Sequence, residues 1–227
     1  GKLLKAMKAQ NDKFAPKVGY RGIEVEEDFF DDLKDEKNLK FYKQDVRSFE
    51  WVTGAVNNCL TTSIFSLQFM PKRNRQIIIQ RVYESLVKGG AFICAEKIYS
   101  EHAQLQEMMQ FCYYDYKRQF YSAEELLDKE QNLRHMMKPL TMDELVGMCR
   151  TAGFEVVQPF WQNFNFVALL CIKEAEGKFS DGEIIHALDL IGFNLFRGSW
   201  EEFKKLKINR DLSMIEPYTN SKRKYIN

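Results

Sequence analysis

Two carboxylates stand at the ends of apolar stretches in the first fifth of the sequence. Glu24 closes residues 18–25 and Asp45 closes residues 39–46, and both stretches are strand-like. An acid at the end of a strand can accept hydrogen bonds from both hydroxyl groups of a ribose, as in dinucleotide-binding folds. Strand-end acids are also commonly solvated or begin a turn, so the residue types alone leave both roles open.

A polar bend follows a third apolar stretch. Residues 63–70, SIFSLQFM, place Phe65, Ser66, Leu67 and Gln68 between an apolar run and a basic helix. Ligands of parallel α/β folds lie across the carboxyl ends of the strands, so these residues are candidates for lining a site. The alternative for Gln68 is a satisfied polar group that caps the next helix.

A stripe rich in methionine and aromatic residues occupies residues 107–118, EMMQFCYYDYKR. At helical spacing such a stripe most often packs in the core or forms a lid over a site. Tyr114, Lys117 and Arg118 are its candidates for facing an active site.

Helices and strands alternate over the first 99 residues, which is typical of a parallel, doubly wound α/β sheet. The predicted helices and strands are 1–10, 18–25, 26–35, 39–46, a buried strand within 57–69, 74–88 and 91–99. Gly89 and Gly90 are expected to stop the helix at 74–88.

Three helices and a strand pair are expected next. The helices are 102–120, 122–140 and 141–154, and the last two begin with capping boxes, Ser122 with Glu125 and Thr141 with Glu144. Residues 154–162 and 164–173 then read as an antiparallel pair with a turn around residues 162 and 163, which completes a mixed sheet. Residues 174–227 are expected to form a helical C-terminal extension with helices at 180–196 and 199–207.

Composition excludes several classes of protein. Hydrophobic residues make up 45% and charged residues 29% of the 227 residues, close to globular averages. The net charge of +1 argues against a strongly basic nucleic-acid binder, although not against a local basic face. No apolar stretch approaches 18 residues and no signal peptide is visible, so neither a membrane span nor secretion is predicted.

The cysteines and histidines predict neither disulfides nor metal ligands. None of the cysteines forms a Cys-x-x-Cys pair, and three lie in strand-like runs, which predicts reduced thiols in a cytoplasmic protein. The five are Cys59, Cys94, Cys112, Cys149 and Cys171. The histidines lack the spacing of zinc ligands. They are His102, His135 and His186.

Taken in order, these segments resemble the class I S-adenosylmethionine (SAM)-dependent methyltransferases, and in particular the carboxy-SAM synthases of bacterial tRNA wobble-uridine modification. The resemblance is carried by FSLQFM…GGAFICAEK, YYDYKRQFYS and AGFEVVQPFWQNFNFVALLCIK, and it runs from about residue 1 to 173. It implies a Rossmann-like class I methyltransferase fold, a mostly parallel sheet ending in an antiparallel hairpin, with a helical insertion. It also implies a homodimer and a methyltransferase-like domain over residues 1–173.

The resemblance also assigns roles around a SAM cofactor, or carboxy-SAM. Glu24 with Val25 would bind the ribose, and Asp45 with Val46 the adenine. Gly1 would be the last glycine of the family's glycine-rich turn, whose preceding strand is then missing from this chain. The bend would form the wall next to the sulfonium, with Phe65 and Ser66 at the cofactor. The candidates for catalysis are Gln68 and Tyr114, together with Glu130 at a position where the sequence departs from the family.

Two positions depart from the family pattern. The arginine that pairs with the extra carboxylate of carboxy-SAM is replaced by Glu130, and the asparagine before the bend by Ile64. A unit charge pair 4 Å apart is worth about 4 kcal/mol at an effective dielectric constant of 20, so the first change matters for a carboxylated ligand. Lys129 or Arg134 would have to compensate.

Three functions remain open. A SAM-dependent transferase that methylates an unidentified acceptor is favoured, with carboxy-SAM synthesis from SAM and prephenate as the alternative. The third is a catalytically inactive, methyltransferase-like binding module, with residues 174–227 as its interaction arm. The resemblance leaves room for a nucleic-acid acceptor, but the sequence does not identify one.

Overall fold

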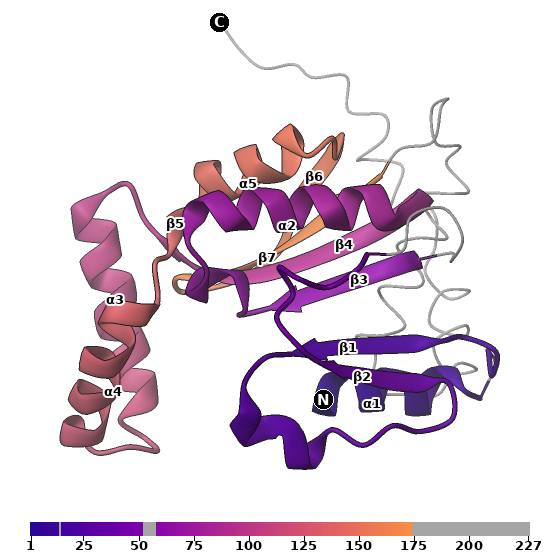
Figure 1. The fold of residues 1–227 in the computed structure, drawn as a ribbon. Coiled ribbons are helices and arrows are strands. Elements are labelled where there is room, and N and C mark those ends of the chain that lie inside the picture. The colour runs from indigo at the N-terminus through magenta and orange to yellow at the C-terminus, as the bar shows by residue number, and fades with distance from the viewer. Residues whose placement is uncertain (14, 52–57, 174–227) are drawn as a thin grey trace, which may run out of the picture. The chain divides into compact units, whose positions relative to one another are not determined.

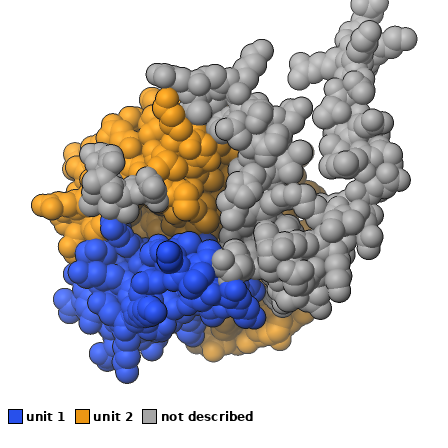
Figure 2. All heavy atoms as spheres, turned by 90° about the vertical axis from the view of Figure 1, so that its right-hand side faces the viewer, with its two compact units in different colours: residues 1–43, 188–227 blue, residues 44–187 orange. Residues whose placement is uncertain are grey.

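The computed structural model describes residues 1–13, 15–51 and 58–173. They fall into two compact units: unit 1 contains the described residues up to Lys43, and unit 2 those from Gln44 onward (Figure 2). The predicted helices at 180–196 and 199–207 lie outside the described residues. Within the described part, no helix is both long and apolar enough to cross a membrane.

Unit 1 is a small parallel sheet covered by a helix. It contains α1 (Lys2–Asn11), β1 (Tyr20–Glu24), the 3-10 helix η1 (Glu27–Asp32) and β2 (Leu39–Lys43). β1 and β2 pair in parallel. The core of the unit consists of Tyr20, Leu33, Leu39 and Phe41, with Leu4, Met7 and Phe30 packed against it.

Two expectations for this region were wrong. The segment at 26–35 forms a six-residue 3-10 helix and not an α-helix. Acids four residues apart, such as Glu27 with Asp31, repel each other on an α-helix, and 3-10 helices are used for such short segments. β2 ends at Lys43, so Asp45 lies beyond the strand and does not end it.

Unit 2 contains a mixed sheet with the strand order β3-β4-β7-β6. β3 (Asn58–Ile64) is parallel to β4 (Leu86–Tyr99), whereas β7 (Phe166–Ile172) is antiparallel to β4 and to β6 (Val156–Asn163). The short β5 (Leu140–Thr141) pairs with the end of β4. Over the two sheets three of the described pairings are parallel and two antiparallel, whereas the sheet of unit 2 alone has two of each and ends in the predicted hairpin of β6 and β7.

Two helices pack on one face of this sheet, α2 (Lys72–Ser85) and α5 (Met142–Thr151) (Figure 1). They bury an apolar cluster against the strands. Its members include Ile78, Ile79, Val82, Phe92, Cys94, Leu145, Cys149, Phe154, Val167, Leu169 and Cys171. β3 itself is only partly buried, in contrast to the buried strand expected there.

The expected stop of α2 at the glycine pair was wrong. α2 ends at Ser85, and Gly89 and Gly90 lie inside β4. The register with β3 slips between Leu86 and Ala91, where Gly89 has a φ of 74°. The glycines therefore accommodate a bulge in a strand, because Gly89 adopts a backbone conformation that other residues rarely do.

The predicted helical insertion is present. α3 (Ala103–Lys117) and α4 (Ala123–Met136) lie side by side at the left of Figure 1, beyond the end of the sheet. Both predicted capping boxes form: the Ser122 hydroxyl accepts from the Glu125 N–H at 3.2 Å, and that of Thr141 from the Glu144 N–H at 3.2 Å.

Gly153, which follows α5, should not tolerate a side chain. Its φ is +110°, and a Cβ there would lie 2.7 Å from Cζ of Tyr83. Gly153→Ala should lower the free energy of unfolding by about 2 kcal/mol or more, because it combines backbone strain with overpacking. Urea unfolding followed by circular dichroism measures this.

Gly147, within α5, provides the matched control. Nothing lies within 4 Å of a Cβ built there, so Gly147→Ala should raise stability by about 0.5–1 kcal/mol. Equal effects of the two substitutions would contradict the strain argument.

Candidate functional site

The predicted bend forms at the end of β3. Phe65 has a φ of 54°, a conformation that non-glycine residues rarely adopt, and the short 3-10 helix η2 (Leu67–Phe69) follows. The Phe65 N–H donates to the Ala95 carbonyl at 2.7 Å, which ties the bend to β4. Such backbone conformations cost on the order of 1–3 kcal/mol and persist only where surrounding contacts hold them.

Glu96, on β4, supplies those contacts. Its Oε1 accepts hydrogen bonds from the N–H groups of Leu67 at 3.0 Å and Ser66 at 3.3 Å, and its Oε2 from that of Gln68 at 2.8 Å. Burial raises the pKa of Glu96 to about 7, although the three N–H donors and Arg75 act to lower it. One carboxylate thus satisfies three consecutive backbone donors.

The backbone and side chain of Gln68 are held on other sides as well. Its Oε1 accepts from the Lys97 N–H at 2.8 Å, and its carbonyl accepts from Arg75 Nη2 at 3.1 Å. Arg75 also donates through Nε to the Met70 carbonyl at 2.8 Å. Gln68 is buried and its side-chain oxygen is satisfied by β4, but it does not cap α2 as the alternative expected, because the N-cap of α2 is Pro71 and has no side-chain bond.

A pocket of about 110 Å³ lies beside Gln68 and is lined by residues of β4, α3, α4 and β7. It brings together the three residues predicted to be catalytic, Gln68, Tyr114 and Glu130. Phe166, which also lines it, contacts the ring of Phe65 at a centroid distance of 5.5 Å. The bend and the helical insertion therefore meet at one pocket.

Cations and aromatic rings dominate the wall of this pocket. The ammonium groups of Lys97 and Lys117 lie 5.7 and 5.6 Å from the centroid of the Tyr113 ring, within the range of cation–π attraction. The charged residues that line the pocket are Lys97, Lys117, Glu125, Lys129 and Glu130. Arg118, the other basic candidate on the stripe, is the C-cap of α3 and is not among the lining residues.

Glu130 faces a buried lysine. Its Oε1 lies 3.8 Å from Nζ of Lys97, whose side chain is only 7% exposed. Burial lowers the pKa of Lys97 and Glu130 opposes that shift. Burial also raises the pKa of Tyr114, and Glu130 adds to it. The pocket thus contains an acid, Glu130, whose charge acts on the pKa of both a buried amine and a phenol.

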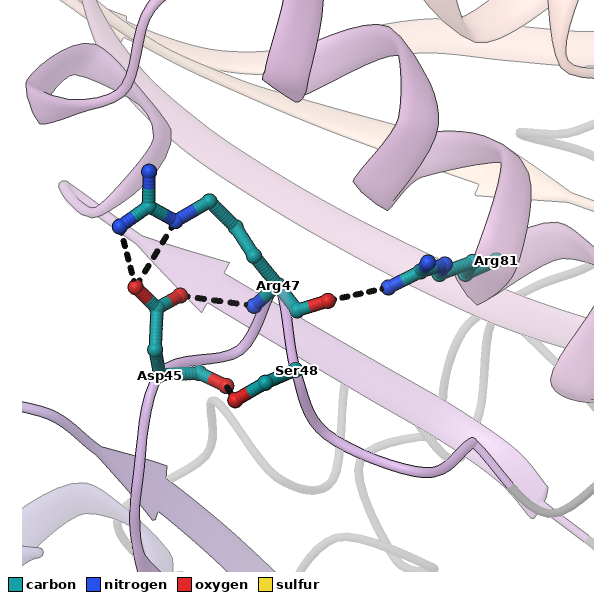
Figure 3. A network of polar contacts seen from close by, with 4 residues as sticks. All are labelled: Asp45, Arg47, Ser48 and Arg81. Carbon is teal, nitrogen blue, oxygen red and sulfur yellow. Dashed lines mark hydrogen bonds and ion pairs between the residues drawn. The ribbon is translucent and has the colours of Figure 1, made fainter.

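Asp45 forms a turn with Arg47 (Figure 3). Its Oδ1 accepts from the Arg47 N–H and its Oδ2 from Arg47 Nε, both at 2.8 Å, and the guanidinium lowers the pKa of Asp45. Arg81 of α2 donates to the Arg47 carbonyl at 2.6 Å, so α2 fixes the turn. Val46 packs against the apolar cluster of unit 2. The bond to Arg47 was not predicted, and it engages the carboxylate that was expected to bind the adenine.

The remaining predicted cofactor residues belong to unit 1. Glu24 ends β1 as predicted, and its Oε1 accepts from the N–H groups of Val25 at 2.9 Å and Glu26 at 3.0 Å. Val25 is 60% exposed. Gly1 is the N-cap of α1, and a Cβ on it would lie 2.7 Å from Cδ2 of Leu33. The predicted cofactor residues are thus divided between the two units.

Glu96, Lys97 and Arg75 were missed at the level of the sequence. For Glu96 and Lys97 the sequence contained one indication, a pair of charged residues inside the apolar run 91–99. Charged residues are almost never fully buried without partners, so such a pair in a buried strand indicates specific contacts.

Comparisons with known proteins agree with this architecture. No family model matches the chain. A carboxy-S-adenosyl-L-methionine synthase of Staphylococcus epidermidis is 36% identical over 140 residues, which cover 61% of this chain and 60% of that protein. One of Nitratiruptor sp. is 30% identical over 137 residues, covering 60% and 56%. The chain thus spans little more than half the length of these relatives.

A solved structure shares the fold. It is a chain in the complex between the Haloferax volcanii Trm112 methyltransferase activator and a methyltransferase, with a TM-score of 0.51 and 13% identity over 75% of this chain and 78% of that one. The predicted resemblance is confirmed. So is the predicted Rossmann-like fold of the class I methyltransferases.

Proposed function

We propose that the protein binds SAM and transfers a group derived from it. The similarity to carboxy-SAM synthases over 140 residues carries this proposal, and the methyltransferase fold supports it. Residues Gly1, Glu24, Val25, Asp45, Val46, Phe65 and Ser66 are the proposed cofactor-binding set. Asp45 would have to exchange its bond with Arg47 for one with the adenine.

The negative charge of Glu130 favours methyl transfer. Glu130 lines the pocket and already pairs with Lys97. A carboxylate here attracts the positive sulfonium of SAM and repels an added carboxylate, and it can serve as a general base toward an incoming nucleophile. Tyr114 and Gln68 line the same pocket as further candidates for contact with the acceptor.

Carboxy-SAM synthesis is the second candidate, and a specific observation favours it. Three lysines line the pocket, Lys97, Lys117 and Lys129, against the two acids Glu125 and Glu130. These cations can hold a carboxylate where the resembled synthases use the arginine that Glu130 replaces. The two candidates share SAM and differ in the charge of the transferred group.

The cellular setting is also a proposal. All five cysteines are free, and three of them are buried, as expected of a reduced, cytoplasmic protein. The resemblance to the carboxy-SAM synthases suggests a place in tRNA modification, whereas the net charge of +1 gives no support to a nucleic-acid acceptor.

SAM or its demethylated product should bind with micromolar affinity, about −8 kcal/mol. Glu24→Ala should weaken binding at least tenfold, because the ribose hydroxyls lose their acceptor. Isothermal titration calorimetry measures both. Glu27→Ala, which removes an exposed acid in η1, is the matched control and should bind as the wild type does. Absence of heat with either ligand would contradict the proposal.

Glu130→Arg should shift the preference from SAM toward carboxy-SAM by more than tenfold. The charge interaction between residue 130 and the added carboxylate changes from repulsion to attraction, and in a partly dry pocket this is worth over about 1.4 kcal/mol. Competition binding with both cofactors measures the preference. Glu124→Arg makes the same charge change on α4 at an exposed position outside the pocket and should leave it unaltered. Equal preferences in wild type and Glu130→Arg would remove the argument for methyl transfer.

A homodimer is the expected assembly, as the resemblance implies. The helical insertion exposes large apolar side chains, and such patches mark interaction surfaces. They include Met108, Phe111, Phe120, Leu127 and Met136. Light scattering at tens of micromolar should give the mass of a dimer, and Phe111→Lys combined with Leu127→Lys should give that of a monomer. A monomeric wild type would rule the dimer out.

A further inference from the structure

The bend at residues 65–68 shapes one side of the pocket, and the hydrogen bonds of its four backbone N–H groups come from β4. It presents Gln68 to the pocket and Phe65 to Phe166, and it contains a strained residue, Phe65. Three of its four backbone N–H groups donate to one side chain, that of Glu96. The fourth, that of Phe65, donates to the backbone of β4.

We propose that Glu96 is the positioning residue of this site: its ionised carboxylate sets the conformation of the bend by accepting three consecutive backbone N–H groups. Glu96 does not line the pocket of 110 Å³, and it contacts Gln68 only through the backbone N–H of that residue, so it acts through the bend. The consequence for cofactor affinity rests on the proposed function, whereas the consequence for the bend does not.

The geometry requires both oxygens of the carboxylate. Oε1 serves Ser66 and Leu67, and Oε2 serves Gln68. A proton on either oxygen adds a donor and makes that oxygen a much weaker acceptor, and a glutamine replaces one of the two oxygens with an NH₂ donor. One backbone N–H, or two if Oε1 is the oxygen affected, then loses most of its hydrogen bond, which destabilises the observed bend relative to alternatives.

The pKa of Glu96 reflects a balance between burial and the groups around it. Arg75 from α2 attracts the carboxylate, and Cys94 lies on the same strand. Glu144 from α5 pairs with Lys72 and also faces Arg75, and Lys97 adjoins Glu96 in a small internal cavity. Burial outweighs these contacts and raises the pKa of Glu96 to about 7. The fraction of molecules with an ordered bend should therefore rise between pH 6 and pH 8.

The effect on overall stability has the opposite sign. The folded state holds this proton more tightly than the unfolded chain does, so ionisation of Glu96 between pH 4.5 and 7 lowers the stability of the fold. The same ionisation completes the hydrogen bonds of the bend. Local order of the bend and global stability thus respond to pH in opposite directions, which distinguishes positioning from a general structural role.

Amide hydrogen exchange of the ¹⁵N-labelled protein tests the proposal without any ligand. Protection factors of Ser66, Leu67 and Gln68, corrected for the intrinsic pH dependence of exchange, should rise about tenfold from pH 6 to pH 8 in the wild type. In Glu96→Gln they should be low and independent of pH. Glu107→Gln, at an exposed acid of α3, should behave as the wild type. Unchanged protection in Glu96→Gln overturns the proposal.

The wild-type series keeps the test decisive even when Glu96→Gln does not fold. Amides of the buried α2 residues Ile78 and Ile79 should not gain protection over this pH range. A wild-type bend whose protection follows that of α2, or does not change with pH, overturns the proposal.

Calorimetry with SAM separates this inference from the proposed function. Affinity should rise with pH in the wild type, and Glu96→Gln should bind at least tenfold more weakly at pH 8 without that pH dependence. No binding to the wild type at any pH refutes the proposed function, and the exchange data then decide on Glu96 alone. Equal affinity in both proteins, with a loosened bend in Glu96→Gln, overturns the link between bend and cofactor.

Discussion

The conformation of the bend depends on the buried carboxylate of Glu96, which lies on β4 of unit 2 and accepts three backbone hydrogen bonds. Burying an ionised group costs several kcal/mol unless hydrogen bonds and opposite charges compensate. Around Glu96 the compensation comes from three backbone N–H groups and from Arg75. Because Arg75 also donates to the carbonyls of Gln68 and Met70, the start of α2 and the end of β3 are fixed by the same few polar contacts.

That arrangement determines what the pocket can recognise. Gln68 is positioned by Glu96 through its backbone and by Lys97 through its side chain, while the side chain of Lys97 turns to Glu130. Adjacent residues of β4 therefore serve two purposes, one shaping the bend and the other setting the charge of the pocket. A change at Glu130 alters the charge and leaves the bend as it is.

Local rules predicted the parts of the fold that depend on local sequence. The capping boxes at Ser122 and Thr141 and the hairpin of β6 and β7 follow from short-range patterns, and all of them form. The end of α2 was not predicted correctly. Gly89 lies at the shift in register between β3 and β4, and this pairing of distant segments cannot be read from the local sequence.

The site was less predictable for the same reason. The place of Glu24 at the end of β1 was predicted, because a strand end can be recognised from the local pattern. Glu96 stands within a strand, and its partners are 28–30 residues away in the chain. The bond between Asp45 and Arg47 spans two residues but depends on a turn that α2 fixes through Arg81.

The position of the helical insertion has a consequence for how such a protein can diversify. β4 and β7 are neighbours in the sheet, although α3, α4, β5, α5 and β6 lie between them in the sequence. The entropy of closing a long connection grows only with the logarithm of its length, by about 0.6 kcal/mol for each doubling. Helices α3 and α4, which carry Tyr113, Tyr114, Lys117 and Glu130, can therefore be lengthened or exchanged at little cost to the pairing of β4 with β7. The sheet and the bend can stay constant in a lineage while the helical wall of the pocket is rebuilt.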